Sequence, residues 1–443
     1  MEENAHSPAD TSVSERVTDA IHHAPIGPLQ IGVFVIGFVL SMLEGFDVLA
    51  IAFASVSIQR ELNLTPDQMG ILFSSGLLGM MLGAMMLTLL SDLLGRRRMI
   101  LAALTLSGVS MVLTPLPESL WAIAALRLLT GVGVGVLLAT VATIVAEFAP
   151  VRWRSLMVNA SLAGFAFGAV VGGIVSAEII GVYGWGSIFY GGGALTLMLV
   201  LLVWIGLPES PEFLLSRRPQ GALESLNRIL AKLDMQPLER LDPPREEAQK
   251  GLLSGGPGQL LSSEWRGRTL LLWLSFGFSY GGLYFLLNWI PQIVNAAGAS
   301  ETVSIYALTA FNVGAVAGIL LLGVLSGQGR TSLMVGVFFV ACAASMMVFP
   351  FVQGDVILLV CGLMGGLIQG AVVGLYVCGT ILYPAEVRAT GVGWGIGLGR
   401  IGGVVGPYLA GQLLALELSV PWLFFIFAAP LLISAWAALR LRV

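Results

Sequence analysis

The stretch AEFAPVRWRS, residues 146–155, recurs in altered form as ILYPAEVRAT, residues 381–390. In each copy a proline is followed four residues later by an arginine: Pro150 and Arg154, Pro384 and Arg388. The same offset relates the start of the first long apolar run to the region where the seventh begins. The chain therefore contains an internal repeat that divides it into two similar halves.

The composition indicates that most of the chain lies in lipid. Its 443 residues are 56% hydrophobic and only 11% charged, with a mean hydropathy of +0.89, whereas soluble domains carry about 25% charge. Windows of about 20 apolar residues, the length of a membrane-spanning helix, predict twelve segments: 31–56, 69–90, 99–117, 119–146, 156–178, 187–207, 268–292, 303–326, 331–351, 356–381, 389–412 and 421–439. We therefore expect an all-α membrane protein with twelve transmembrane helices in two pseudo-symmetric six-helix halves, an arrangement known in secondary transporters.

A break in the series of apolar segments divides the chain into four parts. Residues 1–28 are polar and are expected to form a cytoplasmic tail, because a signal peptide would begin with basic residues and have a shorter apolar core. Residues 29–207 and 268–443 are expected to form the two six-helix halves. Residues 208–267, which contain Pro-Pro and Gly-Gly-Pro, are expected to form a partly helical cytoplasmic linker.

The basic residues predict the orientation in the membrane. If the amino terminus is cytoplasmic, all of the 22 Lys and Arg residues except Arg60, Arg127 and Arg400 fall in cytoplasmic tails and loops. Basic residues accumulate on the cytoplasmic side, so both termini are expected there. The three cysteines lie in apolar runs with neither a paired framework nor metal-site spacing, so we expect no metal and no cofactor.

Two acidic residues interrupt the first apolar segment, within LEGFDVLAIAF, residues 43–53. An acid at the centre of a membrane helix costs about 2.5–3.5 kcal/mol, and intramembrane charges usually mark functional cavities. Asp47 and, in the fourth segment, Arg127 lie at a similar depth of about 12–14 Å, and Glu44 shares the helix face of Asp47. The sequence predicts an ion pair between Asp47 and Arg127, which either couples transport to protons or only fixes helix packing.

Proton coupling is the interpretation that we develop. The three histidines all lie in the amino-terminal tail, and arginine stays protonated, so carboxyl groups are the available proton carriers within the membrane. An arginine that approaches a carboxylate in one state and withdraws in another would alternately expel and recruit a proton. Asp47 is the predicted carrier, with Glu44 tuning it or the substrate site.

Arg400 lies midway along the eleventh segment, in GIGLGRIGG, and no acid occurs within the second-half segments to neutralise it, apart from Glu386 at a loop edge. An unpaired arginine in the bilayer is costly, and a guanidinium suits a carboxylate, so a substrate anion is one predicted partner. Backbone carbonyls or an acid across the cavity are the alternatives. Further aromatic and amide side chains either line the cavity or only pack: Tyr284, Asn288, Trp289, Tyr306, Asn312, Gln369 and Tyr376.

Five motifs carry a resemblance to a known family. SDLLGRRR, residues 91–98, is similar to the loop pattern G-x-x-x-D-R-x-G-R-R. Thr88 stands where that pattern has its first Gly, and Leu93 stands where it has its first Arg. RLLTGVGVG, residues 127–135, matches R-x-x-x-G-x-G-x-G. LPESPEFL follows the sixth segment, and YPAEVRATGVGWGIGLGRIGG covers the eleventh, while GFD in the first segment resembles D-G-[FY]-D with Glu44 in place of the first Asp.

Over nearly its whole length the chain resembles the major facilitator superfamily, most closely the aromatic acid:proton symporters of the benzoate/4-hydroxybenzoate transporter type. The resemblance implies that Asp47 and Glu44 serve proton coupling or substrate binding, with Arg127 as their partner. It also implies a cytoplasmic gate around Asp92, for which an acid in a short loop can dock on a helix amino terminus or a basic residue. The residues expected at this gate are Asp92, Arg96, Arg97, Glu147, Arg154, Glu386 and Arg388.

The expected function is import of an aromatic carboxylic acid with protons, by alternating access, across a bacterial cytoplasmic membrane. Another small organic solute (sugar, nicotinate or dicarboxylate) and efflux by an antiporter are the alternatives, although Ala169 stands where many drug exporters carry a proline. An enzyme is not expected, since the chain has no H-E-x-x-H and no membrane histidine. The expected partners are the aromatic carboxylate, protons and the lipid bilayer, with no nucleic acid and a monomeric state.

Overall fold

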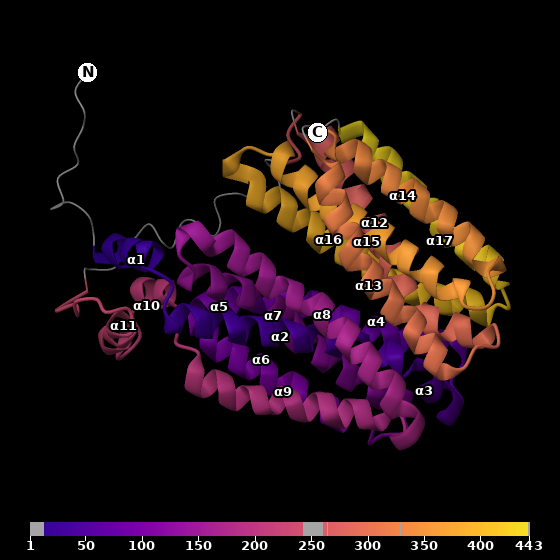
Figure 1. Cartoon of the computed structure of the whole chain (residues 1–443), viewed down its shortest axis with the longest axis horizontal. Helices are drawn as coiled ribbons and strands as arrows, with labels where there is room; N and C mark the ends of the chain where they lie inside the picture. Colours follow the sequence, from indigo (N-terminus) through magenta and orange to yellow (C-terminus); the bar gives the residue numbers. More distant parts are fainter. Residues whose placement is uncertain (1–12, 242–259, 264, 328, 442–443) are drawn as a thin grey trace.

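The computed structural model describes residues 13–241, 260–263, 265–327 and 329–441, and no strand occurs among them (Figure 1). The chain is a bundle of long helices that forms two bodies, the first coloured indigo to magenta and the second orange to yellow (Figure 1). The first body contains α1 (Val13–His23), α2 (Pro28–Phe53), α3 (Ser55–Glu61), α4 (Pro66–Leu82), the π-helix η1 (Gly83–Leu87), α5 (Thr88–Leu94), α6 (Arg96–Leu113), α7 (Leu120–Phe148), α8 (Val151–Tyr183) and α9 (Gly186–Gly206).

Two short helices follow before the second body begins. They are α10 (Pro211–Arg217) and α11 (Ala222–Ala231). The second body contains α12 (Arg266–Ala296), α13 (Glu301–Leu325), α14 (Thr331–Val348), the 3-10 helix η3 (Phe349–Phe351), α15 (Val356–Leu382), α16 (Ala385–Ala415) and α17 (Val420–Leu441).

The predicted twelve-helix fold class is confirmed. The second predicted segment corresponds to α4, η1 and α5 in succession, and each of the other eleven corresponds to one long helix. Within the described residues, ten helices are long and apolar enough by themselves to cross a membrane. The two that fall short are α6, which begins with three consecutive arginines, and α16, which is rich in glycine and carries Arg400.

The internal repeat appears as a repeated packing order. In the first half α2 packs on α8, α4 on α7 and α6 on α9. In the second half the corresponding helices pair in the same order, with α12 on α16, α13 on α15 and α14 on α17. The contacts between the halves follow the same symmetry, because α4 meets α16 and α8 meets α13.

Glycines allow these helices to approach closely. A Cβ on Gly131 would lie 2.0 Å from the carbonyl oxygen of Gly76, and one on Gly135 would lie 2.2 Å from that of Met80, so both glycines face α4. Gly133 faces α6, where a Cβ would lie 2.0 Å from the Ser107 hydroxyl oxygen. Small residues at helix contacts of this kind are typical of membrane proteins, and here they fix α7 between α4 and α6.

The two halves are joined near α3, at what we term the α3 end of the bundle. Ser57 Oγ donates to Glu301 Oε1 at 2.5 Å, and Arg60 donates to the same carboxylate at 3.3 Å. Nearby, the Tyr306 hydroxyl donates to Glu178 at 2.6 Å. From this end the halves diverge toward the opposite end, which carries α1, α10 and α11 and is termed the linker end (Figure 1).

The helices α1, α10 and α11 pack on the linker end of the first half. Val17 of α1, Leu214 of α10 and Leu226 of α11 are buried in one apolar cluster that also includes Phe148 of α7. The described residues of the predicted tail and residues 208–241 of the predicted linker are therefore folded onto the first half, whereas Trp265 of the linker packs on Tyr383 of the second half. The predicted boundaries of the four parts stay predictions, and residues 242–259 of the linker lie outside the described residues.

Candidate functional site

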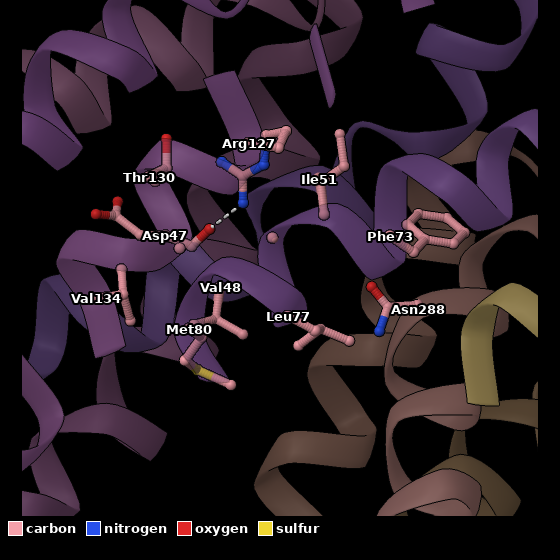
Figure 2. Close-up of a pocket in the computed structure, with 12 residues that line it drawn as sticks. Asp47, Val48, Ile51, Phe73, Leu77, Met80, Arg127, Thr130, Val134 and Asn288 are labelled. Carbon is pink, nitrogen blue, oxygen red and sulfur yellow. Dashed lines mark hydrogen bonds between the residues drawn. The ribbon is translucent and has the colours of Figure 1, made fainter. Parts of the chain in front are cut away.

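A pocket lies between the two halves (Figure 2). Its walls come from α2, α4 and α7 of the first half and from α12 of the second. The space within it, together with its opening, is about 330 Å³. The lining residues include three of the predicted site residues and are otherwise mostly apolar: Asp47, Val48, Ile51, Phe73, Gly76, Leu77, Met80, Arg127, Thr130, Gly131, Val134 and Asn288.

Asp47 and Arg127 meet in this pocket, but not as the ion pair that the sequence predicts. Arg127 Nη2 donates to the main-chain carbonyl oxygen of Asp47 at 2.9 Å, and the Asp47 carboxylate points away from the guanidinium (Figure 2). The guanidinium also lies over the ring of Phe189, 5.7 Å from its centroid. The expected contact is therefore corrected to a guanidinium–carbonyl contact, because these two neighbours already hold the arginine.

Polar atoms at this site are left without partners among the described residues. Asp47 and Arg127 are each 2% exposed, yet Asp47 Oδ1 and Arg127 Nε and Nη1 form no hydrogen bond. Glu44, one turn earlier on α2, is 1% exposed and neither of its carboxyl oxygens has a partner. Polar groups buried without partners are costly, so this concentration of them is typical of a functional centre.

A second group of predicted residues forms a charged network at the linker end of the first half. Arg96 pairs with Glu147, with Asp92 at 3.6 Å and with Glu212 at 3.3 Å. Ser210 Oγ donates to Glu147. The structure thus brings Asp92 and Arg96, four residues apart in one motif, together with Glu147 from a distant segment of the sequence.

The motif LPESPEFL joins this network, which the sequence did not predict. Its Glu209 accepts a hydrogen bond from the main-chain N–H of Arg97 at 2.9 Å. Gly95 has a φ of +102°, and a Cβ at Gly95 would lie 2.6 Å from Glu209 Oε2, so glycine is required at this turn. The two acids of the motif, Glu209 and Glu212, could have indicated this contact from the sequence. Only the folded chain shows that they lie next to Arg97 and Arg96.

For Arg154 and Arg388, which were predicted for the same gate, the structure shows interactions outside this network. Arg154 is close to His22 of α1, and burial, followed by the charge of Arg154, lowers the pKa of that histidine. Arg388 Nε donates to the Tyr383 carbonyl oxygen at 3.3 Å. The Glu386 side chain lies outside those that the structure describes. The network that the structure shows among the described residues thus lies within the first half, and the gate roles of Arg154, Glu386 and Arg388 stay predictions.

Arg400 lies beside a cluster of aromatic rings in the second half. The hydroxyl groups of Tyr280 and Tyr376 are hydrogen-bonded to each other, and Tyr284 stacks at an angle on Tyr280 with centroids 5.9 Å apart. All three tyrosines are close enough to Arg400 to feel its charge. Tyr284 and Tyr376 were predicted site residues, whereas Tyr280 was missed.

The other predicted cavity residues have partners elsewhere. Trp289 Nε1 donates to the Pro407 carbonyl oxygen at 3.0 Å, and its ring packs edge-on against Phe73. Asn312 donates to the Leu308 carbonyl oxygen of its own helix at 2.8 Å, while Tyr306 binds Glu178 at the α3 end. Gln369 is half-buried on α15. Asn288 lines the pocket and donates to the Tyr284 carbonyl oxygen, which connects the pocket to the tyrosine cluster.

Comparison with known proteins identifies the class of molecule as a multi-pass membrane transporter. The family model described as Major Facilitator Superfamily matches residues 31–407, and the chain belongs to that superfamily. The xylose transporter XylE from E. coli, solved in an inward open conformation, has the same fold, with a TM-score of 0.70 at 17% identity over 92% of this chain and 95% of that one. The fold and the relatives are those of transporters and not of enzymes.

Within the superfamily the relatives are aromatic acid transporters. The gallate transporter of Pseudomonas putida is 30% identical over 436 residues, covering 98% of this chain and 96% of that protein. The 4-hydroxybenzoate transporter PcaK of Acinetobacter baylyi is 28% identical, covering 94% and 91%. The predicted family is confirmed over nearly the whole chain.

Proposed function

We propose that this transporter imports an aromatic carboxylic acid together with protons across a bacterial cytoplasmic membrane. The names of the relatives support the substrate class, since they carry gallate and 4-hydroxybenzoate. Arg400 supports an anionic substrate, because it is a cation without an ion-pair partner among the described side chains.

The observation that carries the proton coupling is the arrangement of Arg127 and Asp47. The guanidinium holds the main-chain carbonyl of Asp47 while its Nη1 and Nε remain unpartnered, and the carboxyl group of the same residue is buried and free. A rotation of the Asp47 side chain would exchange the carbonyl contact for a carboxylate contact. Arg127 would then bind either the carbonyl or the carboxylate of Asp47. The carboxyl group could keep a proton in the first state and release it in the second, as proton coupling requires.

The conformation supports alternating access. The halves are joined at the α3 end and diverge toward the linker end (Figure 1). If the linker end is cytoplasmic, as the distribution of basic residues predicts, this is an inward-facing state. The fold match to XylE in its inward open conformation agrees with that assignment. Outward opening would then require the contacts of Glu301 and Tyr306 across the halves to break.

Uptake by proteoliposomes tests the proposal. Purified protein is reconstituted with an inward proton gradient, and accumulation of labelled gallate, 4-hydroxybenzoate, benzoate, nicotinate and xylose is followed with and without an uncoupler. We expect one or more of the aromatic acids to accumulate and the uncoupler to abolish accumulation. Accumulation of xylose alone, or loss of a preloaded acid in exchange for protons, would contradict import of an aromatic acid.

A further inference from the structure

The paired hydroxyl groups of Tyr280 and Tyr376 have an unused hydrogen-bonding capacity. When two phenol groups bind each other, one O–H donates and the other O–H keeps its proton free for a further acceptor. Both tyrosines come from the second half, one from α12 and one from α15. Tyr280 is 8% exposed and Tyr376 is half-buried, so the pair is partly shielded from solvent.

Arg400 adds a positive charge to the same place. Its Nη1 is buried and has no hydrogen-bond partner among the described residues, and its charge acts on both hydroxyl-bearing rings. Arg400 as a whole is half-buried. Such a cation beside a free O–H donor is a site for an anion, because an anion can accept from both groups at once. A neutral ligand would leave the charge of Arg400 uncompensated.

The surroundings favour a flat aromatic ligand. Phe276 meets the Tyr376 ring edge-on, with centroids 5.2 Å apart, and Tyr280 and Tyr284 form the next ring contact. Gly399 and Gly403 of α16 face these rings, since a Cβ there would lie 3.1 Å from Tyr280 and 2.7 Å from Tyr284. The surroundings of Arg400 on α16 are thus aromatic rings and glycine backbone.

We infer that the Tyr280–Tyr376 hydroxyl pair binds the substrate carboxylate together with Arg400, and that this pair sets the preference for aromatic acids over neutral aromatic compounds. The inference rests on the proposed function and adds to it the groups that recognise the carboxylate. Arg400 supplies the charge, and the pair supplies the directed hydrogen bond.

The test compares substrates that share the carboxylate and differ at the ring. Initial uptake rates are measured for benzoate, which has no ring hydroxyl, and for 4-hydroxybenzoate, in Tyr280→Phe, Tyr376→Phe and the double variant. A lost hydrogen bond to a charged group should raise KM about tenfold or more, and by the same factor for both acids. Because the hydroxyl groups act as a pair, the double variant should raise KM by less than the product of the single factors.

Tyr408→Phe, an identical change on the exposed face of α16, is the matched control and should leave KM unchanged. An unchanged KM in both single variants overturns the inference. A rise for 4-hydroxybenzoate alone also overturns it, since the pair would then recognise the ring hydroxyl. Size-exclusion profiles and melting temperatures of the variants separate these outcomes from misfolding.

A binding measurement separates failure of this inference from failure of the proposed function. The increase in melting temperature of the detergent-solubilised protein is recorded with benzoate and with neutral benzamide. Stabilisation by benzoate that is lost in Tyr376→Phe supports the anion site even if no import is observed. Equal stabilisation by benzamide, or none by benzoate, overturns it.

Discussion

At the scale of single residues, the carboxyl groups of Asp47 and Glu44 differ in their surroundings, although they lie one turn apart. Asp47 lines the pocket between the halves and has Arg127 at its main-chain carbonyl. Glu44 is absent from the pocket lining, and both of its oxygens are without partners among the described residues. Only Asp47 is therefore placed to exchange contacts with Arg127 when the pocket changes shape.

We expect Asp47→Asn to abolish accumulation driven by a proton gradient while leaving folding intact, because an amide cannot carry the proton. Exchange of labelled for unlabelled substrate across the membrane should persist, since it needs no net proton movement. Both are measured in proteoliposomes with 4-hydroxybenzoate. Glu44→Gln is the comparison and should alter KM more than accumulation; full accumulation by Asp47→Asn would sink the assignment.

The sequence predicted individual site residues better than their partners. Asp47, Arg127 and Arg400 were identifiable because a charge in an apolar segment is costly. Tyr280 was missed because an aromatic residue among others on one helix is usually a packing residue. Its partner Tyr376 lies 96 residues away in the sequence, so the contact is visible only in the folded chain. The carbonyl contact of Arg127 was equally hidden, since depth along a helix does not give the direction of a side chain.

At the scale of helices, close packing through glycine decides where Arg127 lies. Gly131 follows it by one turn and contacts the Gly76 carbonyl of α4. Gly131→Ala would place a methyl group about where that carbonyl stands and force α4 and α7 apart. Overpacking of this kind costs about 1–3 kcal/mol, so we expect a lower melting temperature in detergent together with slower uptake.

Gly393→Ala is the matched control for this change, because nothing lies within 4 Å of a Cβ at that position of α16. Alanine is a better helix former than glycine, so the control should keep or slightly raise the melting temperature. Equal effects of the two substitutions would show that α4 and α7 are not held by glycine contact. The comparison uses the same residue exchange in two membrane helices.

Helix α1 is an element that hydropathy does not predict. The amino-terminal tail reads as polar, yet Val17 and Ile21 are buried against the first half. An eleven-residue amphipathic segment is too short to register as a span, and its docking partners are distant in sequence. The π-helix η1 was hidden for a similar reason, because a wider helical turn leaves the apolar composition of a segment unchanged.

The docking of α1 should depend on pH through His22. Burial and Arg154 lower the pKa of His22 below its ordinary value of 6.5, so the docked state favours the neutral ring. The stabilisation that the neutral His22 ring gives to docked α1 is fully present above pH 6.5. It is lost as the pH falls from 6.5 through the lowered pKa of His22. The protection factors of the α1 amides, which are exchange rates corrected for the intrinsic effect of pH, should therefore be lower at pH 5 than at pH 8.

His22→Gln should remove this pH dependence, whereas His23→Gln should keep it, because His23 is exposed and bonded to the main chain of Asp19. Protection factors that respond to pH equally in both variants would exclude His22 as the cause.

At the scale of the whole molecule, the contacts between the halves limit how the transporter can move. The pairs α4–α16 and α8–α13 join the halves, and the second pair meets where Gly173 faces Thr309. A Cβ on Gly173 would lie 2.2 Å from Thr309 Oγ1, which brings the two Cβ positions within the range of a disulfide. A covalent bond at this point would hold the α3 end closed.

We expect the variant Gly173→Cys with Thr309→Cys to lose nearly all uptake after oxidation and to regain it after reduction, because outward opening requires α8 and α13 to separate. Each single cysteine variant, treated in the same way, should transport after oxidation at the same rate as before oxidation. Cross-linking is quantified by the mobility of the protein after cleavage of the chain between α11 and α12, and transport by uptake of 4-hydroxybenzoate. Full uptake by fully cross-linked protein would mean that the α3 end does not open, and alternating access between these two halves would have to be abandoned.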